Sequence, residues 1–206
     1  MGAPTLTYAQ LKELDPCEES RERVVKLLGG ARKWGENGVT AAQAKEAGCT
    51  LDDLVWAASA LARRDKDVER RLRLWMADCA ARVLHIYERT ETSEAPRNAI
   101  IAARQFARGE IDGAAWAAAW GAAGAAARGA AGAAARGAAG AAAMAAAGDA
   151  AGAAARAAAW AAACDAARAD ARGAEEAWQL DRLVAWMSDV EPDDWPLPAR
   201  QKKDAA

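Results

Sequence analysis

The stretch Gly121-Ala-Ala-Gly-Ala-Ala-Ala-Arg128 decides the fold, because the same eight letters follow from Gly129 to Arg136. These repeats lie inside a tract, residues 113–172, that is almost entirely alanine and glycine. Alanine is the strongest helix former, so the tract is predicted to be helical. Larger or special residues recur at every fourth position, and this regularity indicates a packed scaffold rather than a particular chemistry.

Glycine is the unusual component of this tract. Nine glycines lie between residues 113 and 152, and each costs about 1 kcal/mol relative to alanine inside a helix. Four residues turn a helix by about 400°, so a stripe of period four drifts by about 40° per unit on a single helix. We therefore expect two to four antiparallel helices of about 12 to 25 residues, with small residues where they cross.

Three positions in the tract are typical of helix ends. Gly148-Asp149 places a stop directly before an N-cap residue, so it is the main expected break. Arg128-Gly129 and Arg136-Gly137 each place a cation in a last turn before glycine, which is typical of a helix C-terminus.

Short capped helices are expected before the tract. Thr7 to Gln10 matches a capping box, and Thr40 and Thr50 are expected to cap two further helices. Asp15-Pro16 is typical of a helix start, and Gly29-Gly30 is typical of its end.

The segment Asp67 to Arg89 is the most regular predicted helix. Apolar residues at spacings of three and four form one face, namely Val68, Leu72, Trp75, Cys79, Val83 and Ile86. Its charged residues are assigned to the other faces, namely Arg70, Arg71, Arg73, Asp78 and Arg82. Later helices are expected at 97–108 and about 175–188, and Asp112 is the expected N-cap of the tract.

No stretch shows sustained strand alternation, so the predicted fold class is all-α. We expect a compact multi-helix bundle with Ala/Gly-rich, closely packed antiparallel helices. Three parts are predicted: a small helical N-terminal region at 1–65 that begins as a loose end, an Ala-rich helical domain at 66–190, and an acidic, proline-containing tail at 191–206 that is partly disordered. Trp195 of this tail is expected to dock back on the body.

Charge and composition argue against several classes of function. The chain has 27 basic and 29 acidic residues, so a nucleic-acid partner is not expected. Four cysteines without metal-ligand spacing and a single histidine predict no metal and no cofactor. Arginines within the tract disfavour a membrane span, and the first residues do not match a signal peptide. The chain is expected to be cytoplasmic.

No catalytic constellation stands out. His85 has no nucleophile or orienting carboxylate at an obvious spacing, so it is interpreted as structural, and the protein is predicted not to be an enzyme. Cys79 and Cys164 are interpreted as small core residues.

Candidate partner-binding residues lie in the tract and the tail. Trp116 and Trp120 are i,i+4 neighbours, which either plug the core beside alanine walls or anchor a partner. The tract arginines either mark solvent-facing sides or contact a partner, and the acidic tail is suited to a basic one. The full set is Trp116, Trp120, Arg128, Arg136, Arg156, Asp193, Asp194 and Trp195.

Two segments before the tract carry a family resemblance. They are Arg71-Leu-Arg-Leu-Trp-Met-Ala-Asp-Cys-Ala-Ala-Arg-Val-Leu84 and Pro96-Arg-Asn-Ala-Ile-Ile-Ala-Ala-Arg-Gln-Phe-Ala-Arg-Gly-Glu110. With the Ala-rich tract, over residues 70–186, the chain resembles the Imm-5-like immunity protein family of bacteria and phages. The resemblance implies a small, cytoplasmic, helical protein that binds and neutralises a partner toxin, and no catalytic residues come with it.

The leading hypothesis is therefore a non-enzymatic binding protein of the immunity type, with a protein partner. The alternative is a phage counter-defence protein that binds a host defence component or sequesters a nucleotide signal between Arg128, Arg136 and Trp120. A third, weaker hypothesis is an enzyme that uses His85. A homodimer is compatible with the first two.

Overall fold

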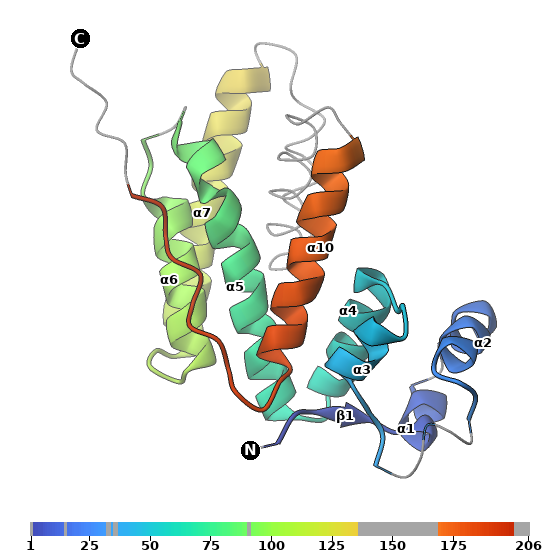
Figure 1. The fold of residues 1–206 in the computed structure, drawn as a ribbon. Coiled ribbons are helices and arrows are strands. Elements are labelled where there is room, and N and C mark those ends of the chain that lie inside the picture. Colours follow the sequence, from blue (N-terminus) through green and yellow to red (C-terminus); the bar gives the residue numbers. More distant parts are fainter. Residues whose placement is uncertain are drawn as a thin grey trace. The chain divides into compact units, whose positions relative to one another are not determined.

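The computed structural model describes residues 2–14, 16–31, 34, 37–89, 92–135 and 169–199. Apart from one two-stranded sheet, the regular elements of this part of the chain are helices, which confirms the all-α class (Figure 1). The chain forms two compact units. Unit 1 comprises residues 1–75 and 173–193, and unit 2 comprises residues 76–172 and 194–206.

Unit 1 contains mostly short elements (Figure 1). They are β1 (Thr5–Leu6), α1 (Tyr8–Glu13), α2 (Glu18–Leu27), β2 (Val39–Thr40), α3 (Ala41–Glu46), α4 (Leu51–Ala62), the first part of α5 (Lys66–Glu88) and most of α10 (Ala169–Trp186).

The predicted caps at Thr7, Thr40 and Thr50 are confirmed. Each threonine hydroxyl accepts a hydrogen bond from the backbone N–H three residues later, and the side chain of that residue accepts one from the threonine N–H. Each capping box provides acceptors for two N–H groups at the start of the helix that have no partner within the helix. All of its contacts span only three residues. This locality explains why the sequence alone located these helix starts.

Helix α2 differs from its prediction at one end only. It begins at Glu18, with Cys17 as an N-cap that makes no side-chain cap hydrogen bond, rather than at the predicted Pro16. Asp15 lies outside the described residues. The predicted end is confirmed, because Gly29 and Gly30 take φ values of 80° and 93°, which side chains rarely adopt.

The small sheet corrects the expectation of a loose N-terminal end. Leu6 pairs with Val39 in an antiparallel ladder, and the indole Nε1 of Trp34 donates a 2.6 Å hydrogen bond to the Leu6 carbonyl. Leu6, Leu11 and Trp34 are the buried centre of a core cluster. Gly38 is required beside them, because its φ is +75° and an added Cβ would lie 2.9 Å from the Leu6 carbonyl. Strands of two residues are too short to show alternation.

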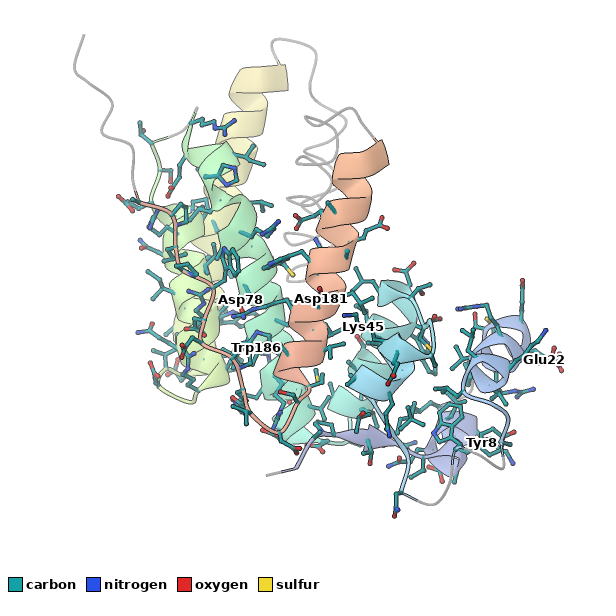
Figure 2. All side chains as sticks on the ribbon, viewed as in Figure 1. Tyr8, Glu22, Lys45, Asp78, Asp181 and Trp186 are labelled. Carbon is teal, nitrogen blue, oxygen red and sulfur yellow. The ribbon has the colours of Figure 1, made fainter. Side chains whose placement is uncertain are left out.

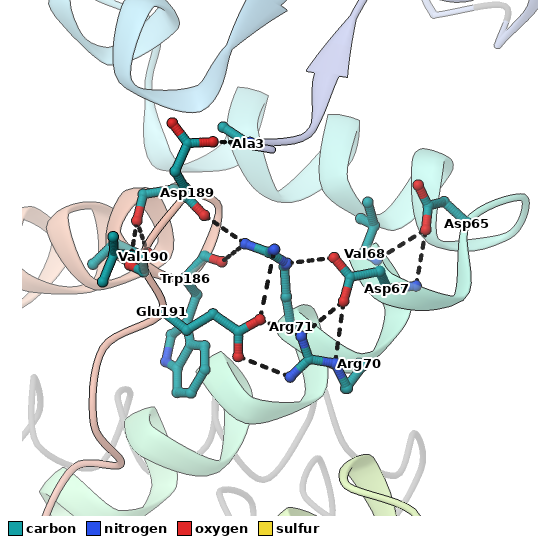
Figure 3. Close-up of polar contacts among 12 residues, drawn as sticks. Ala3, Asp65, Asp67, Val68, Arg70, Arg71, Trp186, Asp189, Val190 and Glu191 are labelled. Atoms are coloured by element: carbon teal, nitrogen blue, oxygen red, sulfur yellow. Dashed lines mark hydrogen bonds and ion pairs between the residues drawn. The ribbon is translucent and has the colours of Figure 1, made fainter. Parts of the chain in front are cut away.

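The end of α10 is held to α5 by the buried guanidinium of Arg71 (Figure 3). Arg71 is 1% exposed and donates to the carbonyl oxygens of Trp186 at 3.0 Å and Ser188 at 2.6 Å. Its Nε donates to the Asp67 carboxylate at 2.6 Å, and its guanidinium lies 3.5 Å from Glu191. The carbonyls at the C-terminus of α10 therefore receive the cation that a helix end favours.

Further contacts also connect the elements of unit 1. Arg70 bridges the carboxylates of Asp67 and Glu191, and Trp75 Nε1 donates to the Gln179 carbonyl at 3.0 Å. Lys45 of α3 forms an ion pair with Asp181 of α10, and both residues are labelled in Figure 2. Leu183, Trp186 and Met187 are buried.

Unit 2 contains the second part of α5, α6 (Ala95–Ala107) and α7 (Gly113–Ala135). Helix α6 begins two residues before the predicted Arg97, because Pro96 lies in its first turn, where a missing N–H costs nothing. The Asp112 carboxylate accepts a 2.8 Å hydrogen bond from the Ala115 N–H, so the predicted cap of α7 is confirmed. Helices α6 and α7 pack against each other (Figure 1).

Helix α7 corrects one expected stop. It continues through Arg128-Gly129 as a 23-residue α-helix, because the surrounding alanines favour the helix and a single glycine costs only about 1 kcal/mol. The other expected ends, Arg136-Gly137 and Gly148-Asp149, lie outside the described residues, as do Cys164 and the segment after 199.

Helix α5 confirms the predicted apolar stripe and corrects the faces assigned to two charges. Val68, Leu72, Trp75, Cys79 and Val83 are all buried. Two of the charged residues that were assigned to the other faces are buried, namely Arg71, 1% exposed, and Asp78, 0% exposed. Both are buried because main-chain groups of the C-terminal segment satisfy them, a long-range effect that helical spacing cannot predict.

We predict that Arg71→Ala lowers the free energy of unfolding by about 3–5 kcal/mol, because it leaves Asp67 and the α10 carbonyls without their buried partner. Arg73→Ala is the matched control, since Arg73 pairs with Glu69 on the same helix but its side chain is 32% exposed. We expect this control to cost less than about 1 kcal/mol. Urea unfolding measures both, and equal losses would contradict the assigned role of Arg71.

The Glu191 anchor predicts a dependence of stability on pH. Hydrogen bonding from Arg70 lowers the pKa of Glu191 in the folded protein, against the opposing effect of burial. The resulting stabilisation is present above the ordinary glutamate pKa of 4.5 and is lost as pH falls through the lowered folded value. Glu191→Gln should therefore lose less stability between pH 6 and about pH 3 than the parent chain does. Glu22→Gln, at an exposed position on α2, should behave like the parent.

Candidate partner-binding site

Three aromatic side chains form a row on α6 and α7. The Phe106 and Trp116 rings stack, with centroids 5.2 Å apart and planes 15° apart. Trp120, one helical turn after Trp116, lies 6.3 Å from it at an interplanar angle of 36°. All three side chains are half-buried. We call these three residues the aromatic row.

The aromatic row combines a fixed geometry with accessible apolar area. Stacked rings stabilise each other by about 0.5–1.5 kcal/mol beyond simple burial, so the row is held in place before any partner arrives. Both expected roles of Trp116 and Trp120 stay open, because each side chain is partly buried within unit 2 and partly exposed. The row is thus able to pack internally and to contact a partner.

The arginines of the predicted binding set are described less fully. Arg128 lies on α7, and only its backbone position is described. Arg136 and Arg156 lie outside the described residues. The structure therefore brings Trp116 and Trp120 together and leaves these three arginines as predictions.

The tail residue Trp195 is bound through its main chain by two buried charges of unit 2. Asp78 of α5 accepts a 2.7 Å hydrogen bond from the Trp195 N–H. Arg104 of α6 donates to the Trp195 carbonyl at 2.6 Å and to the Asp78 carboxylate at 2.8 Å. Asp78 is 0% exposed and Arg104 is 8% exposed. The predicted docking of Trp195 is confirmed, and its backbone is the part most tightly bound.

The Trp195 side chain also packs within unit 2. The Arg82 guanidinium lies 5.5 Å from the indole ring, within cation–π range. Trp195 and Leu197 pack on a core cluster from α5 and α6, which consists of Ala77, Ala81, Leu84 and Ile100. We call this surface, with Asp78 and Arg104, the α5–α6 surface.

Two further arginines bind the residues on either side of Trp195. Arg108 pairs with Asp194 at 2.5 Å, and this hydrogen bond raises the pKa of Arg108, against the opposing effect of burial. Arg97 donates to the Pro198 carbonyl at 2.7 Å while its other contacts hold Glu88. An extended segment without helix or strand is thus fixed at several points by side chains.

Asp193 belongs to unit 1 and behaves differently. Its side chain is exposed, and its carbonyl accepts a hydrogen bond from Arg182. Of the three tail residues in the predicted set, Asp193 therefore presents its carboxylate to solvent. The charged groups of Asp194 and the main chain of Trp195 are engaged within unit 2.

Unit 1 has a cleft that the sequence did not reveal. Its volume is about 450 Å³, and apolar side chains of α2, α4 and α10 dominate its lining, including Val24, Leu54, Ala57 and Leu183. Trp56 lines the cleft and is 39% exposed. The lining residues come from elements far apart in the sequence, so no local pattern marks the cleft.

Two thiols and one ion pair also line this cleft. Cys17 is exposed, and hydrogen bonding with Ser20 lowers its pKa. Cys49 is buried, and burial raises its pKa. Burial acts to raise the pKa of Asp53, but hydrogen bonds from Arg23 and Thr50 outweigh this effect, so the pKa is lowered. The lining is therefore mainly apolar, with the Arg23–Asp53 ion pair and the charged residues Arg21 and Asp52 among the polar groups.

His85 and the potential metal ligands are the remaining candidates for chemistry. His85 is exposed and its Nδ1 lies 2.9 Å from the Arg82 carbonyl, a local helical contact. Within the described ranges, no three His, Cys, Asp or Glu side chains gather so as to hold a metal ion. No helix in the described part of the chain is long and apolar enough to span a membrane.

The buried charges were missed by reasoning from helical periodicity, yet a signal was available. Asp78 and Arg104 lie inside the two segments, 71–84 and 96–110, that carry the family resemblance. Asp78 also follows Arg71 by seven residues, a spacing that places both charges near one helix face.

A comparison with protein families covers the two segments that contain Asp78 and Arg104. The family described as Imm-5 like putative immunity protein matches residues 63–185, which is more than half of the chain. The chain belongs to this family, and the resemblance inferred from the sequence is confirmed. The curated proteins and the solved structures gave no match. The matched residues include α5, α6 and α7 with the aromatic row, and exclude most of the cleft in unit 1.

Proposed function

We propose that this chain is a non-enzymatic immunity protein that binds a toxin in the cytoplasm and neutralises it by covering a functional surface of that toxin. Family membership supports an immunity-type role. The observation that carries the binding proposal is the aromatic row. It lies within the family-matched residues and exposes part of each ring on a geometry fixed by stacking.

The physical argument rests on the energetics of protein interfaces. Tryptophan is enriched among residues whose truncation costs 2 kcal/mol or more, because it removes a large apolar area from water with few rotatable bonds. A row of rings that already contact one another needs less ordering on binding than separate flexible side chains would. Trp116 and Trp120 therefore make a suitable anchor for an apolar pocket on a partner.

The remaining members of the predicted set would contribute charge. Arg128, Arg136 and Arg156 follow Trp120 at multiples of four residues, and we assign them to acidic groups of the partner. Asp193 presents an exposed carboxylate, which suits a basic group. A partner that reaches Asp194 or Trp195 must compete with the contacts of the α5–α6 surface.

We predict that substitution of the two tryptophans, Trp116→Ala with Trp120→Ala, weakens capture of the partner from lysate of the native host by at least about 30-fold, because two central anchors are removed. Trp56→Ala is the matched control, since Trp56 is an exposed tryptophan of unit 1. The measurement is the amount of a stoichiometric protein partner retained by each tagged chain, with circular dichroism confirming helicity.

Neutralisation is tested separately from capture. Expression of the captured partner should inhibit growth, and co-expression of the parent chain should restore it. The row variant should fail to restore growth while the Trp56 variant succeeds. The toxin-binding proposal fails if no stoichiometric protein is recovered, or if the recovered protein is harmless.

The cleft of unit 1 favours the second candidate function, a counter-defence protein that sequesters a small signal or binds a host defence component. Its volume of about 450 Å³ is in the range of small-molecule sites. The apolar lining suits a base or another flat apolar group better than a phosphate. The predicted nucleotide pocket between Arg128, Arg136 and Trp120 falls mostly on side chains outside the described set.

We predict for this candidate that a nucleotide signal bound in the cleft raises the melting temperature. A ligand at about 100 times its Kd adds about 2.7 kcal/mol to the free energy of unfolding. Thermal unfolding with a panel of linear and cyclic nucleotides measures this. Ala57→Trp, which fills the cleft, should abolish any shift. The absence of a shift with every nucleotide would rule out the sequestration form.

A further inference from the structure

The cleft of unit 1 has an apolar floor and a polar mouth. Its floor consists of side chains that solvent barely reaches, including Trp34, Val68 and Leu183. Helix α2 contributes one wall and has no buried residue, so apolar area of Val24 on this wall is still accessible. The volume of about 450 Å³ is in the range of sites for small organic molecules. The lining therefore suits the apolar body of such a molecule.

Four charged residues line the cleft in the described part of the chain, and three of them have a partner. Arg23 of α2 forms an ion pair with Asp53 of α4. Arg21 lies 3.7 Å from Glu18, one turn earlier on α2. Asp52 is exposed and forms no hydrogen bond or ion pair with its side chain among the described residues. The charge that is left without a partner at the mouth is therefore negative.

Trp56 gives this carboxylate an aromatic neighbour. It lies four residues after Asp52 on α4, and both residues line the cleft. Side chains at this spacing share one face of a helix, with their Cβ atoms about 5–6 Å apart. Trp56 is 39% exposed, and the face of an indole ring attracts ammonium groups. A cation at the mouth would thus be attracted by a carboxylate and by a ring.

We infer that the cleft binds a small organic cation, with its apolar body on the floor and its ammonium group between Asp52 and Trp56. The ammonium group keeps part of its hydration at the mouth, so it avoids most of the desolvation cost of a buried charge. An anionic ligand would instead bring its charge against Asp52. This inference is independent of toxin binding. It differs from nucleotide sequestration in the sign of the ligand's charge, so one series of ligands separates the two.

The test compares three probes that carry a phenyl ring on a four-carbon chain. At neutral pH phenylbutylamine is a cation, phenylbutanol is uncharged and phenylbutyrate is an anion. Isothermal titration calorimetry with the full chain measures the Kd of each probe. We expect the amine to bind with a Kd about tenfold lower than that of the alcohol, from one ion pair and one cation–π contact at a partly exposed site. The butyrate should bind most weakly.

Substitutions at the mouth assign the preference to its residues. Asp52→Asn removes the charge and keeps the shape of the side chain, so the amine should lose most of its advantage while the Kd of the alcohol stays the same. Glu22→Gln is the matched control, because Glu22 is an exposed carboxylate of α2 outside the cleft lining. This control should keep the preference for the amine. Ala57→Trp, which fills the cleft, should abolish binding of both probes.

Several results would overturn the inference. They are a failure of all three probes to bind, tightest binding by the butyrate, a preference for the amine that survives Asp52→Asn, and amine binding that survives Ala57→Trp. Circular dichroism should show the parent's helicity for each variant, and Asp52 and Glu22 are exposed, so their substitution disturbs no core. A melting-temperature shift with a nucleotide but with no amine would support sequestration and contradict the cationic ligand.

Discussion

The structure depends on buried charges of one helix that bind the main chain of the C-terminal segment. In unit 1, Arg71 of α5 donates to the carbonyls of Trp186 and Ser188. In unit 2, Asp78 of the same helix accepts from the Trp195 N–H. Neither charge would be tolerated in the interior without these partners, since an unpaired buried charge costs several kcal/mol. The C-terminal segment is therefore a structural requirement of α5 and not an appendage to it.

The same constraint separates what the sequence predicted from what it did not. Thr7, Thr40, Thr50 and Asp112 were identified as caps because a cap is a contact across three residues, visible in any local window. Arg71 and Asp78 were assigned only to the faces away from the apolar stripe, because helical spacing sorts residues by polarity and cannot detect a partner more than 100 positions away. Trp195 was predicted to dock, but the backbone contacts that hold it were not foreseen.

The Ala/Gly tract shows a second limit of sequence reasoning. Arg128-Gly129 has the chemistry of a helix end, yet α7 passes through it, because stop signals express preferences of about 1 kcal/mol that neighbouring alanines offset. The aromatic row was partly foreseen, since Trp116 and Trp120 are i,i+4 neighbours. Its third member, Phe106, comes from α6, and only tertiary packing brings it there. The cleft of unit 1 is similarly tertiary, and local patterns gave no indication of it.

The family gives these features a functional frame. The match covers α5, α6 and α7, so the buried charge pair and the aromatic row belong to the part of the chain that the family describes. The short elements that form the cleft lie mostly before it, and segment 194–198 follows it. In our account, a family scaffold presents an aromatic surface for protein contact, and a segment outside the match packs on a surface built from family residues.

The central claim is that buried side chains of unit 2 bind the backbone of the C-terminal segment, and hydrogen exchange at the Trp195 amide tests it most directly. Residues 191–199 have no regular secondary structure, so their amides would exchange freely if the segment were unbound. Our account predicts that the Trp195 N–H exchanges at least about 100-fold more slowly than an unstructured amide, because Asp78 accepts its hydrogen bond in the interior. Exchange of this amide at the unprotected rate in the folded protein would contradict the account.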